Sequence, residues 1–306
     1  MSCSSSPGLE PTSRDSDAAL SAPLGKPDIA VIVPTRNSAA TLRVCLRSIR
    51  EQIYSCTLVV VDNGSTDTTM AIAHEFADIV LTCGPERSAQ RNAGAAATSA
   101  AIVRFIDSDM ELPPTVVSEV VEAFRGGAVS VTVPERTVGE GFWAEVRALE
   151  RSFYDGSDTI EAPRLFCRDV FDSVGGFVET LTGAEDWDLG IRTRDAGRRV
   201  RTVSIISHHE GRVRYWTACR KKGYYGAGLL RFVSKHGASA FVGMSLREWW
   251  RHPREMCTSM GVGLVIHKSG ECLAVIVAMV GAKLGDRFGW PGLSRNDMCC
   301  GGRRCP

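Results

Sequence analysis

Two carboxylates separated by one serine, Asp107 and Asp109, follow the apolar segment "IVRFI" at residues 102–106. Asp commonly forms the turn that ends a strand, and one such residue is enough for that role. Two carboxylates this close repel each other unless positive charge lies nearby. The pair therefore consists either of solvated turn residues or of ligands for a cation and the group that the cation carries.

A third carboxylate, Asp62, ends the apolar run "TLVVV" and opens the segment "DNGSTD". The neighbouring Asn-Gly pair can form a turn, and the Ser or Thr after it can cap the next helix. Neither role needs Asp62, whose oxygens can accept a hydrogen bond from the N–H of a nucleobase. The segment "PTRN" at 34–37 also follows an apolar run, and a plain turn explains it equally well.

Two arginines, Arg87 and Arg91, are four residues apart in "ERSAQRNAG", which places them on one face of a helix. In the first turns of a helix, guanidinium groups can neutralise a diphosphate together with the helix N-terminus. The alternative for the same spacing is a solvated basic face.

The elements that must position these side chains alternate in type. Short apolar runs rich in Val and Ile alternate with helical stretches of about ten residues or more, which predicts an α/β fold with a mostly parallel sheet. Ligands bind at the carboxyl ends of the strands in such sheets, where the polar segments lie. The predicted strands are 28–34, 57–62, 78–82 and 102–107, and the predicted helices are 39–52, 68–77 and 88–101.

The order of these motifs, followed by "GAEDWDLGIRTRDAGRRV" at 183–200, resembles the family 2 glycosyltransferases of the GT-A fold over roughly residues 28–211. The resemblance implies a mostly parallel central sheet flanked by helices, with a nucleotide-sugar half at 28–109 and an acceptor half at 110–211. It also implies a UDP- or GDP-sugar donor, a divalent cation (Mg or Mn), and an acceptor hydroxyl or phosphate. The expected chemistry is a single displacement that inverts the sugar.

The resemblance also assigns roles to individual residues. Arg91 would approach the diphosphate, Asp107 would lie near the ribose, and Asp109 would bind the metal. His208 in "SHHEG", which follows a predicted strand at 203–207, would be a further metal ligand, with His209 as the alternative. The residues expected at the nucleobase and ribose are Pro34, Thr35, Asn37 and Asp62.

The "ED" pair at the start of a predicted helix supplies the expected base. Asp186 would take the proton of the acceptor, and Glu185 is the nearer alternative. Carboxylates at a helix N-terminus can also simply complement the helix dipole. Two other functions stay open: a retaining enzyme that makes a small soluble glycoside, and a nucleotide-sugar-binding protein without turnover.

The composition excludes some classes of partner. The 306 residues include 36 Lys and Arg and 35 Asp and Glu, which leaves a net charge of +1. So small a net charge does not attract the phosphate backbone of a nucleic acid. The 11 cysteines lack metal-ligand spacing and predict reduced residues of a cytoplasmic protein. Residues 1–27 predict a disordered leader without a signal sequence, and residues 291–306 a flexible tail.

Residues 212–290 predict a helical segment that mixes aromatic, basic and apolar residues. Its apolar runs at 260–266 and 272–282 are each shorter than the roughly 20 residues that span a bilayer. The first interpretation is a pair of helices lying in a membrane interface, with Trp249 and Trp250 at headgroup depth beside Arg247, Arg251 and Arg254. That interpretation places the protein at the cytoplasmic face of a membrane with a lipid-linked acceptor. The second is a helical appendage packed on the catalytic domain or on a second subunit, with oligomeric state left open.

Overall fold

The computed structural model of the chain describes residues 28–157, 160–237, 249 and 251–288. The predicted leader and tail lie outside these residues, as do Arg247 and Trp250.

The first half alternates strands and helices as the sequence predicts, with boundaries that differ by a few residues. Val and Ile fill β1 and β2, and α1 buries Leu42, Cys45, Leu46 and Ile49, a spacing of three or four residues that forms one helix face. The elements are β1 (Ile29–Thr35), α1 (Ala39–Arg50), β2 (Thr57–Asp62), α2 (Thr69–Phe76), β3 (Ile79–Thr82), α3 (Arg87–Ala96) and β4 (Ile102–Phe105).

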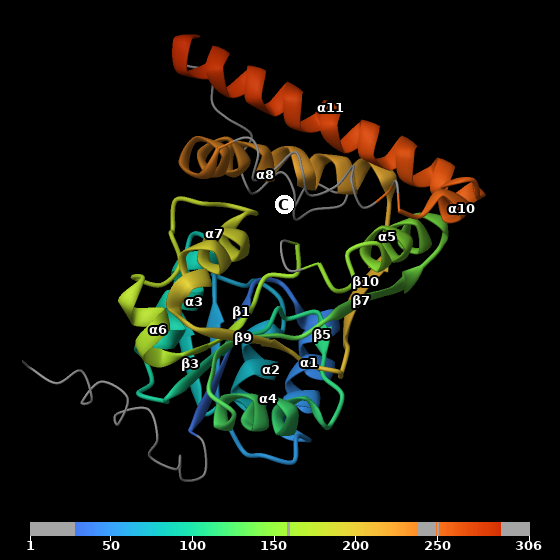
Figure 1. Cartoon of the computed structure of the whole chain (residues 1–306). Coiled ribbons are helices and arrows are strands. Elements are labelled where there is room, and N and C mark those ends of the chain that lie inside the picture. Colours follow the sequence, from blue (N-terminus) through green and yellow to red (C-terminus); the bar gives the residue numbers. More distant parts are fainter. Residues whose placement is uncertain (1–27, 158–159, 238–248, 250, 289–306) are drawn as a thin grey trace, which may run out of the picture.

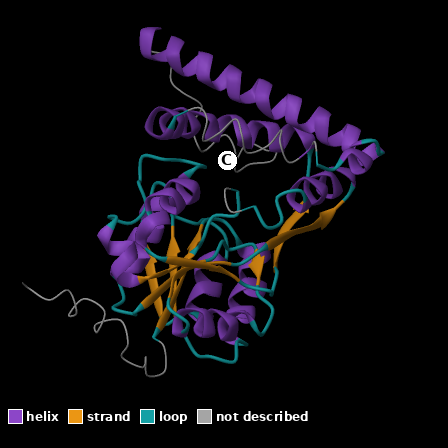
Figure 2. Ribbon diagram, viewed as in Figure 1, coloured by secondary structure: helices purple, strands orange, loops and turns teal. Residues whose placement is uncertain are grey.

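Seven strands form the central sheet, in the order β3-β2-β1-β4-β8-β6-β9. Only β8 (Leu165–Cys167) runs antiparallel to its neighbours, β4 and β6 (Ala128–Thr132), so the expectation of a mostly parallel sheet is confirmed. Helices cover both faces (Figures 1 and 2). The remaining elements of this body are α4 (Val116–Arg125), α6 (Arg168–Ser173), α7 (Glu185–Arg192), a 3-10 turn at Arg194–Ala196, and β9 (Arg198–Arg201).

A second sheet of three strands, in the order β5-β10-β7, stands beside the first. Its members are β5 (Met110–Glu111), β7 (Glu135–Glu140) and β10 (Ile206–Arg212). The bounds predicted for the strand at 203–207 are wrong. The structure begins this strand at Ile206 and continues it through "SHHEG" to Arg212. In β10, His208 pairs with Met110 of β5, which brings the histidine next to Asp109.

Four helices form a layer over the body that contains the central sheet: α5 (Phe142–Ser152), α8 (Tyr215–His236), α10 (Pro253–Met256) and α11 (Ser259–Phe288) (Figure 1). Helices α8 and α11 run side by side in the same direction. Gly223 and Gly226 of α8 permit this approach, because a Cβ atom at either position would lie 3.0–3.1 Å from Ala274 or Val275.

The two apolar runs of the C-terminal segment belong to one helix, α11, and not to two. The charged residues between them do not break it, because they face protein: Lys268 Nζ lies 2.5 Å from Glu150 of α5 and 2.6 Å from Glu271. In the described part of the chain, Ser259–Val280 is the one stretch long and apolar enough to cross a membrane. Trp249 was expected at headgroup depth, but it packs beside Val146 and Leu264.

Helix α8 is fixed to the body that contains the central sheet through α7 and the loop before it. Phe232 packs against Trp187, and the buried Asp188 carboxylate accepts hydrogen bonds from Lys235 (2.6 Å) and His236 (2.8 Å). Trp187 therefore has a packing role, and its indole N–H donates to the carbonyl of Ile160.

We expect Gly228→Ala to loosen this contact. A Cβ atom there would lie 2.0 Å from the carbonyl oxygen of Thr182, which is backbone and cannot rotate away. Overpacking of this kind destabilises by about 1–3 kcal/mol, more than the gain in helix propensity offsets. Urea denaturation measures the change. Ser234→Ala, at an exposed position of the same helix, is the control and should change stability little.

Candidate active site

Arg91 lies at the centre of the polar cluster at the carboxyl ends of the strands. Its side chain is fully buried, and the guanidinium lies across the ring of Phe177 at 5.1 Å. Nη2 donates to Asp107 Oδ1 at 2.8 Å, and Nη1 donates to Asp186 Oδ1 at 2.8 Å. Arg91 therefore joins Asp107, two residues after β4, to Asp186 in the first turn of α7, which lies 95 residues after Arg91 in the chain. In this arrangement it positions two carboxylates, and its predicted contact with a diphosphate stays a prediction.

Asp107 is held by three guanidinium groups. Besides Arg91, Arg164 Nη1 donates to its Oδ2 at 2.9 Å, and Arg87 Nη1 lies 4.0 Å from the same oxygen. Burial alone would raise the pKa of the Asp107 carboxyl, but Arg164, Arg91 and Arg87 hold it well below its usual value. Asp107 is therefore a carboxylate in this structure.

Two residues of the cluster, Arg164 and Glu135, were not found by sequence reasoning. Arg164 lies between Asp107, Glu135 (3.4 Å) and Asp186 (3.5 Å), and these carboxylates keep its pKa well above the usual value against the effect of burial. Burial would raise the pKa of Glu135, but Arg164, His208 and Arg151 lower it to about 2. Glu135 is the first residue of β7, and Arg164 directly precedes β8. Each is a single charged residue, and the neighbouring sequence contains no motif that identifies it as part of a site.

Asp109 and His208 meet across the pairing of β5 with β10. Asp109 Oδ1 lies 3.2 Å from His208 Nε2, close enough for an ion pair. This buried oxygen accepts no hydrogen bond from any described residue. Burial would lower the pKa of His208, but Asp109 and Glu135 raise it to about 9. His209 points elsewhere, with Nε2 2.7 Å from Glu111. Of the two adjacent histidines, the structure places His208 beside Asp109.

The residues predicted for the nucleobase and ribose are linked to one another by hydrogen bonds. Asp62 accepts the backbone N–H and the hydroxyl of Ser65. Asn37, with a φ of 48°, receives a hydrogen bond from Thr66 N–H and donates its own N–H to Ser65 Oγ. These bonds join the turn after β1 to the turn after β2. Pro34 and Thr35 lie at the end of β1, and the Thr35 hydroxyl is buried without a partner among the described residues.

The two candidate bases differ in access to solvent. The side chain of Asp186 is 22% exposed, whereas that of Glu185 is 3% exposed and lies 3.2 Å from Arg87 Nη2. Arg87 in turn lies over the ring of Tyr225, so α8 forms part of the wall beside this end of the cluster. Asp186 is the carboxylate that an incoming hydroxyl can reach.

Within the described residues, no group of three or more His, Cys, Asp and Glu side chains could hold a metal ion by itself. A cation at Asp109 and His208 would therefore need further ligands from a substrate or from water. The cluster as a whole combines carboxylates, of which Asp109 and Asp186 are partly exposed to solvent, with guanidinium groups that attract anions. Such a set can bind a phosphorylated ligand and accept a proton from a hydroxyl.

Comparison with known proteins adds independent findings. Residues 30–178 match the family model described as "Glycosyl transferase family 2". A pre-mycofactocin glycosyltransferase from Mycobacterium tuberculosis is 27% identical over 280 residues, which cover 83% of this chain and 56% of that protein. Glycosyltransferase AglE from Haloferax volcanii is 30% identical over 190 residues, which cover 56% of this chain and 62% of that protein. The chain thus spans less than two thirds of the length of both relatives.

Two solved structures share the fold at low sequence identity. The mannosyltransferase PcManGT from Pyrobaculum calidifontis, in complex with GDP-Man and Mn2+, has a TM-score of 0.56 at 19% identity and covers 88% of this chain and 89% of its own. S. aureus TarS 1-349 has a TM-score of 0.50 at 17% identity and covers 86% of this chain and 92% of its own. At these identities, the likeness establishes the architecture and leaves the substrate open.

Proposed function

Since this chain belongs to glycosyltransferase family 2 and has the GT-A fold, we propose that it transfers a sugar from a nucleotide-diphosphate sugar to an acceptor hydroxyl or phosphate. The reaction depends on a divalent cation and inverts the anomeric carbon. The observation that carries the proposal is the junction made by Arg91, which holds Asp186 on the acceptor side and Asp107 on the donor side within one cluster.

The residues at Asp109 fit a divalent cation. Asp109 offers a buried carboxylate oxygen without a hydrogen-bond partner among the described residues, which is the type of ligand that Mg and Mn prefer, and His208 Nε2 lies 3.2 Å from it. The same carboxylates that raise the pKa of His208 favour positive charge at this position. Asp109 and His208 would hold the ion, which supplies charge stabilisation to the departing diphosphate.

The chain's own residues carry the remaining steps. Asp186 takes the proton from the acceptor hydroxyl, whose oxygen forms a bond to the anomeric carbon as the bond from that carbon to the diphosphate oxygen breaks. Arg91 and Arg164 fix Asp186 in place, with Nη1 at 2.8 Å and Nη2 at 3.5 Å from its two oxygens. Arg87, the more exposed arginine of α3, attracts the phosphates.

The donor is a UDP- or GDP-sugar, in keeping with the GDP-Man and Mn2+ bound by the structural neighbour PcManGT. The acceptor is lipid-linked, and the protein acts at the cytoplasmic face of a membrane. The support for this part is α11, whose inner face packs on α5 and α8 while its outer face remains apolar and exposed.

The metal assignment predicts that Asp109→Asn weakens metal-dependent nucleotide binding by about a hundredfold or more. An amide carries no charge to hold the ion, and charge stabilisation by a bound metal amounts to several kcal/mol. Isothermal calorimetry with UDP and GDP, with and without Mn, measures the effect. Asp195→Asn, on the exposed 3-10 turn, is the matched control.

The proposal as a whole is tested by turnover. Transfer from a UDP- or GDP-sugar that stops on removal of the metal and returns with Mn or Mg supports it, and the anomeric form of the product tests inversion. Nucleotide binding without transfer to any acceptor would instead identify a binding protein. Undiminished metal-dependent binding by a folded Asp109→Asn variant would overturn the metal assignment.

A further inference from the structure

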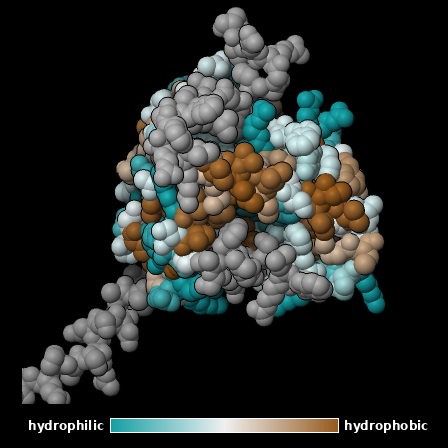
Figure 3. Space-filling view, turned by 90° about the horizontal axis from the view of Figure 1, so that it is seen from above, coloured by the Kyte–Doolittle hydropathy of each residue, from teal (hydrophilic) through white to brown (hydrophobic). Residues whose placement is uncertain are grey.

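The outer face of α11 is an apolar stripe that no other described element of the chain covers. Residues three or four positions apart along the helix are exposed, and Leu273 and Val277 reach 62% and 63% exposure. Of the described side chains of α11, the exposed hydroxyl residues are Ser259 and Ser269. Viewed from the side of α11, apolar residues gather in patches on this face (Figure 3). The exposed apolar residues of the stripe are Val262, Val265, Ile266, Leu273, Ile276, Val277 and Val280.

Below α11 lies a row of four aromatic rings, each in contact with the next. Successive ring centroids from Phe142 through Trp143 and Tyr215 to Trp216 are 4.9–5.0 Å apart. The two ends of the row are open to solvent, since Phe142 is 42% and Trp216 79% exposed. The middle of the row touches α11, where Tyr215 Oη donates to the carbonyl of Ile266.

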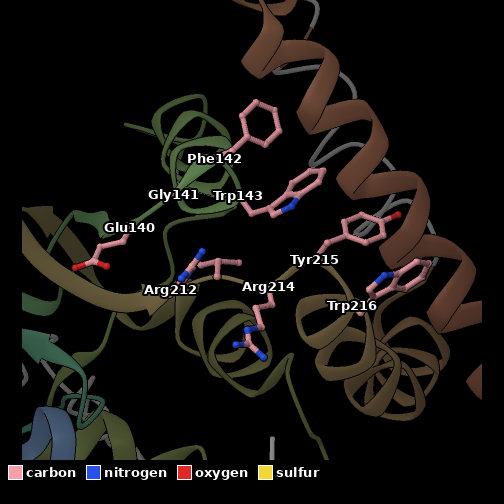
Figure 4. Close-up of a pocket in the computed structure, with 9 residues that line it drawn as sticks. Glu140, Gly141, Phe142, Trp143, Arg212, Arg214, Tyr215 and Trp216 are labelled. Atoms are coloured by element: carbon pink, nitrogen blue, oxygen red, sulfur yellow. The ribbon is translucent and has the colours of Figure 1, made fainter. Parts of the chain in front are cut away.

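The same four rings line an open pocket of about 580 Å³, whose other wall carries charge. Figure 4 shows the rings on the side toward α11 and Arg212, Arg214 and Glu140 on the opposite side. Both arginines are exposed, and neither has an ion pair or side-chain hydrogen bond to the part of the chain that the structure describes. Glu140 offsets one of the two positive charges, so the wall keeps a net positive charge.

These three layers follow one direction, from α11 toward the catalytic body: apolar stripe, aromatic row, arginines. A bilayer surface has the same sequence of environments, because acyl chains lie deepest, amphipathic rings favour the interface, and phosphates lie outermost. We propose that this face docks on an anionic lipid bilayer, with the phosphate of a lipid held by Arg212 and Arg214 in the aromatic pocket. Arg220 and Lys221, exposed on α8, add positive charge near the pocket.

The docking face is connected to the active site by one strand. β10 carries His208 as its third residue and Arg212 as its last, and four residues of strand span at most about 13 Å. Resting on the proposed function, this places His208, the candidate metal ligand, about that far along the strand from the arginine that would hold the lipid phosphate. A lipid-linked acceptor whose head extends from the membrane would reach Asp186 without leaving the bilayer.

A second copy of the chain could also cover the apolar stripe, but it does not explain the two arginines beside the rings, which have no ion pair with a described residue. A twin subunit would bring the same positive charges to the interface, where they would repel. An anionic surface pairs with them. The charge at the pocket therefore favours the membrane.

Flotation of the full chain with vesicles, in buffer without nucleotide, tests the proposal. Binding is expected to phosphatidylglycerol-containing vesicles and to be much weaker to pure phosphatidylcholine. Arg212→Gln with Arg214→Gln should lower the partition coefficient about thirtyfold, or about fivefold for each arginine. Leu273→Gln with Val277→Gln should lower the partition coefficient about a hundredfold or more, since each change removes an apolar side chain that docking would bury in the bilayer.

The matched controls remove the same groups from the opposite side of the molecule (Figure 1). Arg47→Gln with Arg125→Gln deletes two exposed charges on α1 and α4, and Val44→Gln with Val203→Gln deletes two exposed valines. Both pairs should bind vesicles like the original chain. An added arm with inorganic phosphate separates the sources of the ligand: a site for free phosphate would be emptied by it at millimolar concentration, whereas multivalent docking would weaken only as the salt effect predicts.

Vesicle binding that is equal in the stripe variant and its control overturns the docking face. Equal binding by the arginine variant, or full displacement by inorganic phosphate, overturns the lipid-phosphate site. A monodisperse dimer that ignores vesicles assigns the stripe to a second copy. Because flotation needs neither donor nor metal, its failure leaves nucleotide binding and turnover untouched, and loss of those activities leaves flotation intact.

Discussion

Replacing Asp186 by Asn is expected to lower the rate of sugar transfer by about 10²–10⁴ while nucleotide binding survives. The change keeps the shape of the side chain and removes only its ability to take a proton. The Asn oxygen can still accept the hydrogen bond that Arg91 Nη1 gives to Asp186 Oδ1 at 2.8 Å. The new amide group would face Arg164, 3.5 Å from the other oxygen, a modest repulsion at a partly exposed position.

The kinetic measurement is kcat with saturating donor and acceptor, and calorimetry with nucleotide and Mn supplies the binding measurement. Glu185→Gln is the informative comparison, because Glu185 is the adjacent carboxylate and is nearly inaccessible at 3% exposure. We expect it to reduce transfer less than Asp186→Asn. If the order is reversed, Glu185 is the base. If Asp186→Asn loses nucleotide binding as strongly as transfer, Asp186 supports the donor site and takes no proton.

The strand ends and their polar residues could be predicted from sequence because each signal is local. Val- and Ile-rich runs of strand length, followed at once by "PTRN", "DNGSTD" or "DSD", place Asp62, Asp107 and Asp109 at one edge of a parallel sheet. The structure has β1, β2, β3 and β4 within a few residues of the predicted ranges.

The partners of these carboxylates could not be predicted, because they come from distant segments. Arg164 and Glu135 reach Asp107 and His208 through the antiparallel insertion of β8 and the second sheet, and no spacing in the chain encodes that approach. The start of β10 was misplaced for a related reason. Its residues "SHHEGR" are polar, so the strand is specified by pairing with β5 and β7 and not by its own composition.

The C-terminal layer shows the same limit for helices. His267, Lys268 and Glu271 interrupt the apolar pattern of α11, and charge within an apolar run usually marks its end. Here Lys268 pairs with Glu150 of α5, so the charge is buried against protein and the helix continues past it. The opposite face of α11 carries an exposed apolar stripe. The sequence pattern alone does not show which face of the helix packs on protein and which face stays exposed.

Replacing Arg91 by Met is expected to destabilise the protein by about 3–5 kcal/mol, the usual cost of removing one partner from a buried ion pair. Arg91 is fully buried and lies 2.8 Å from both Asp107 and Asp186, which would lose a charge partner while staying largely out of water. The methionine fills most of the volume and keeps the contact with Phe177, so the lost charge and not a cavity would cause the effect. Urea denaturation monitored by tryptophan fluorescence gives the free energy of unfolding.

Arg87→Met is the matched control, because Arg87 lies on the same face of α3 and shares the carboxylates Asp107 and Glu185 with Arg91. Its side chain is 35% exposed, its distances to Glu185 and Asp107 are 3.2 and 4.0 Å, and water can replace it. We expect a loss of about 1 kcal/mol or less. Equal losses for the two variants would mean that the cluster is hydrated throughout and that Arg91 does not hold it together. A large loss confined to Arg91, with transfer also reduced in the folded fraction, would establish that one buried guanidinium sets the distance between the donor-side and acceptor-side carboxylates.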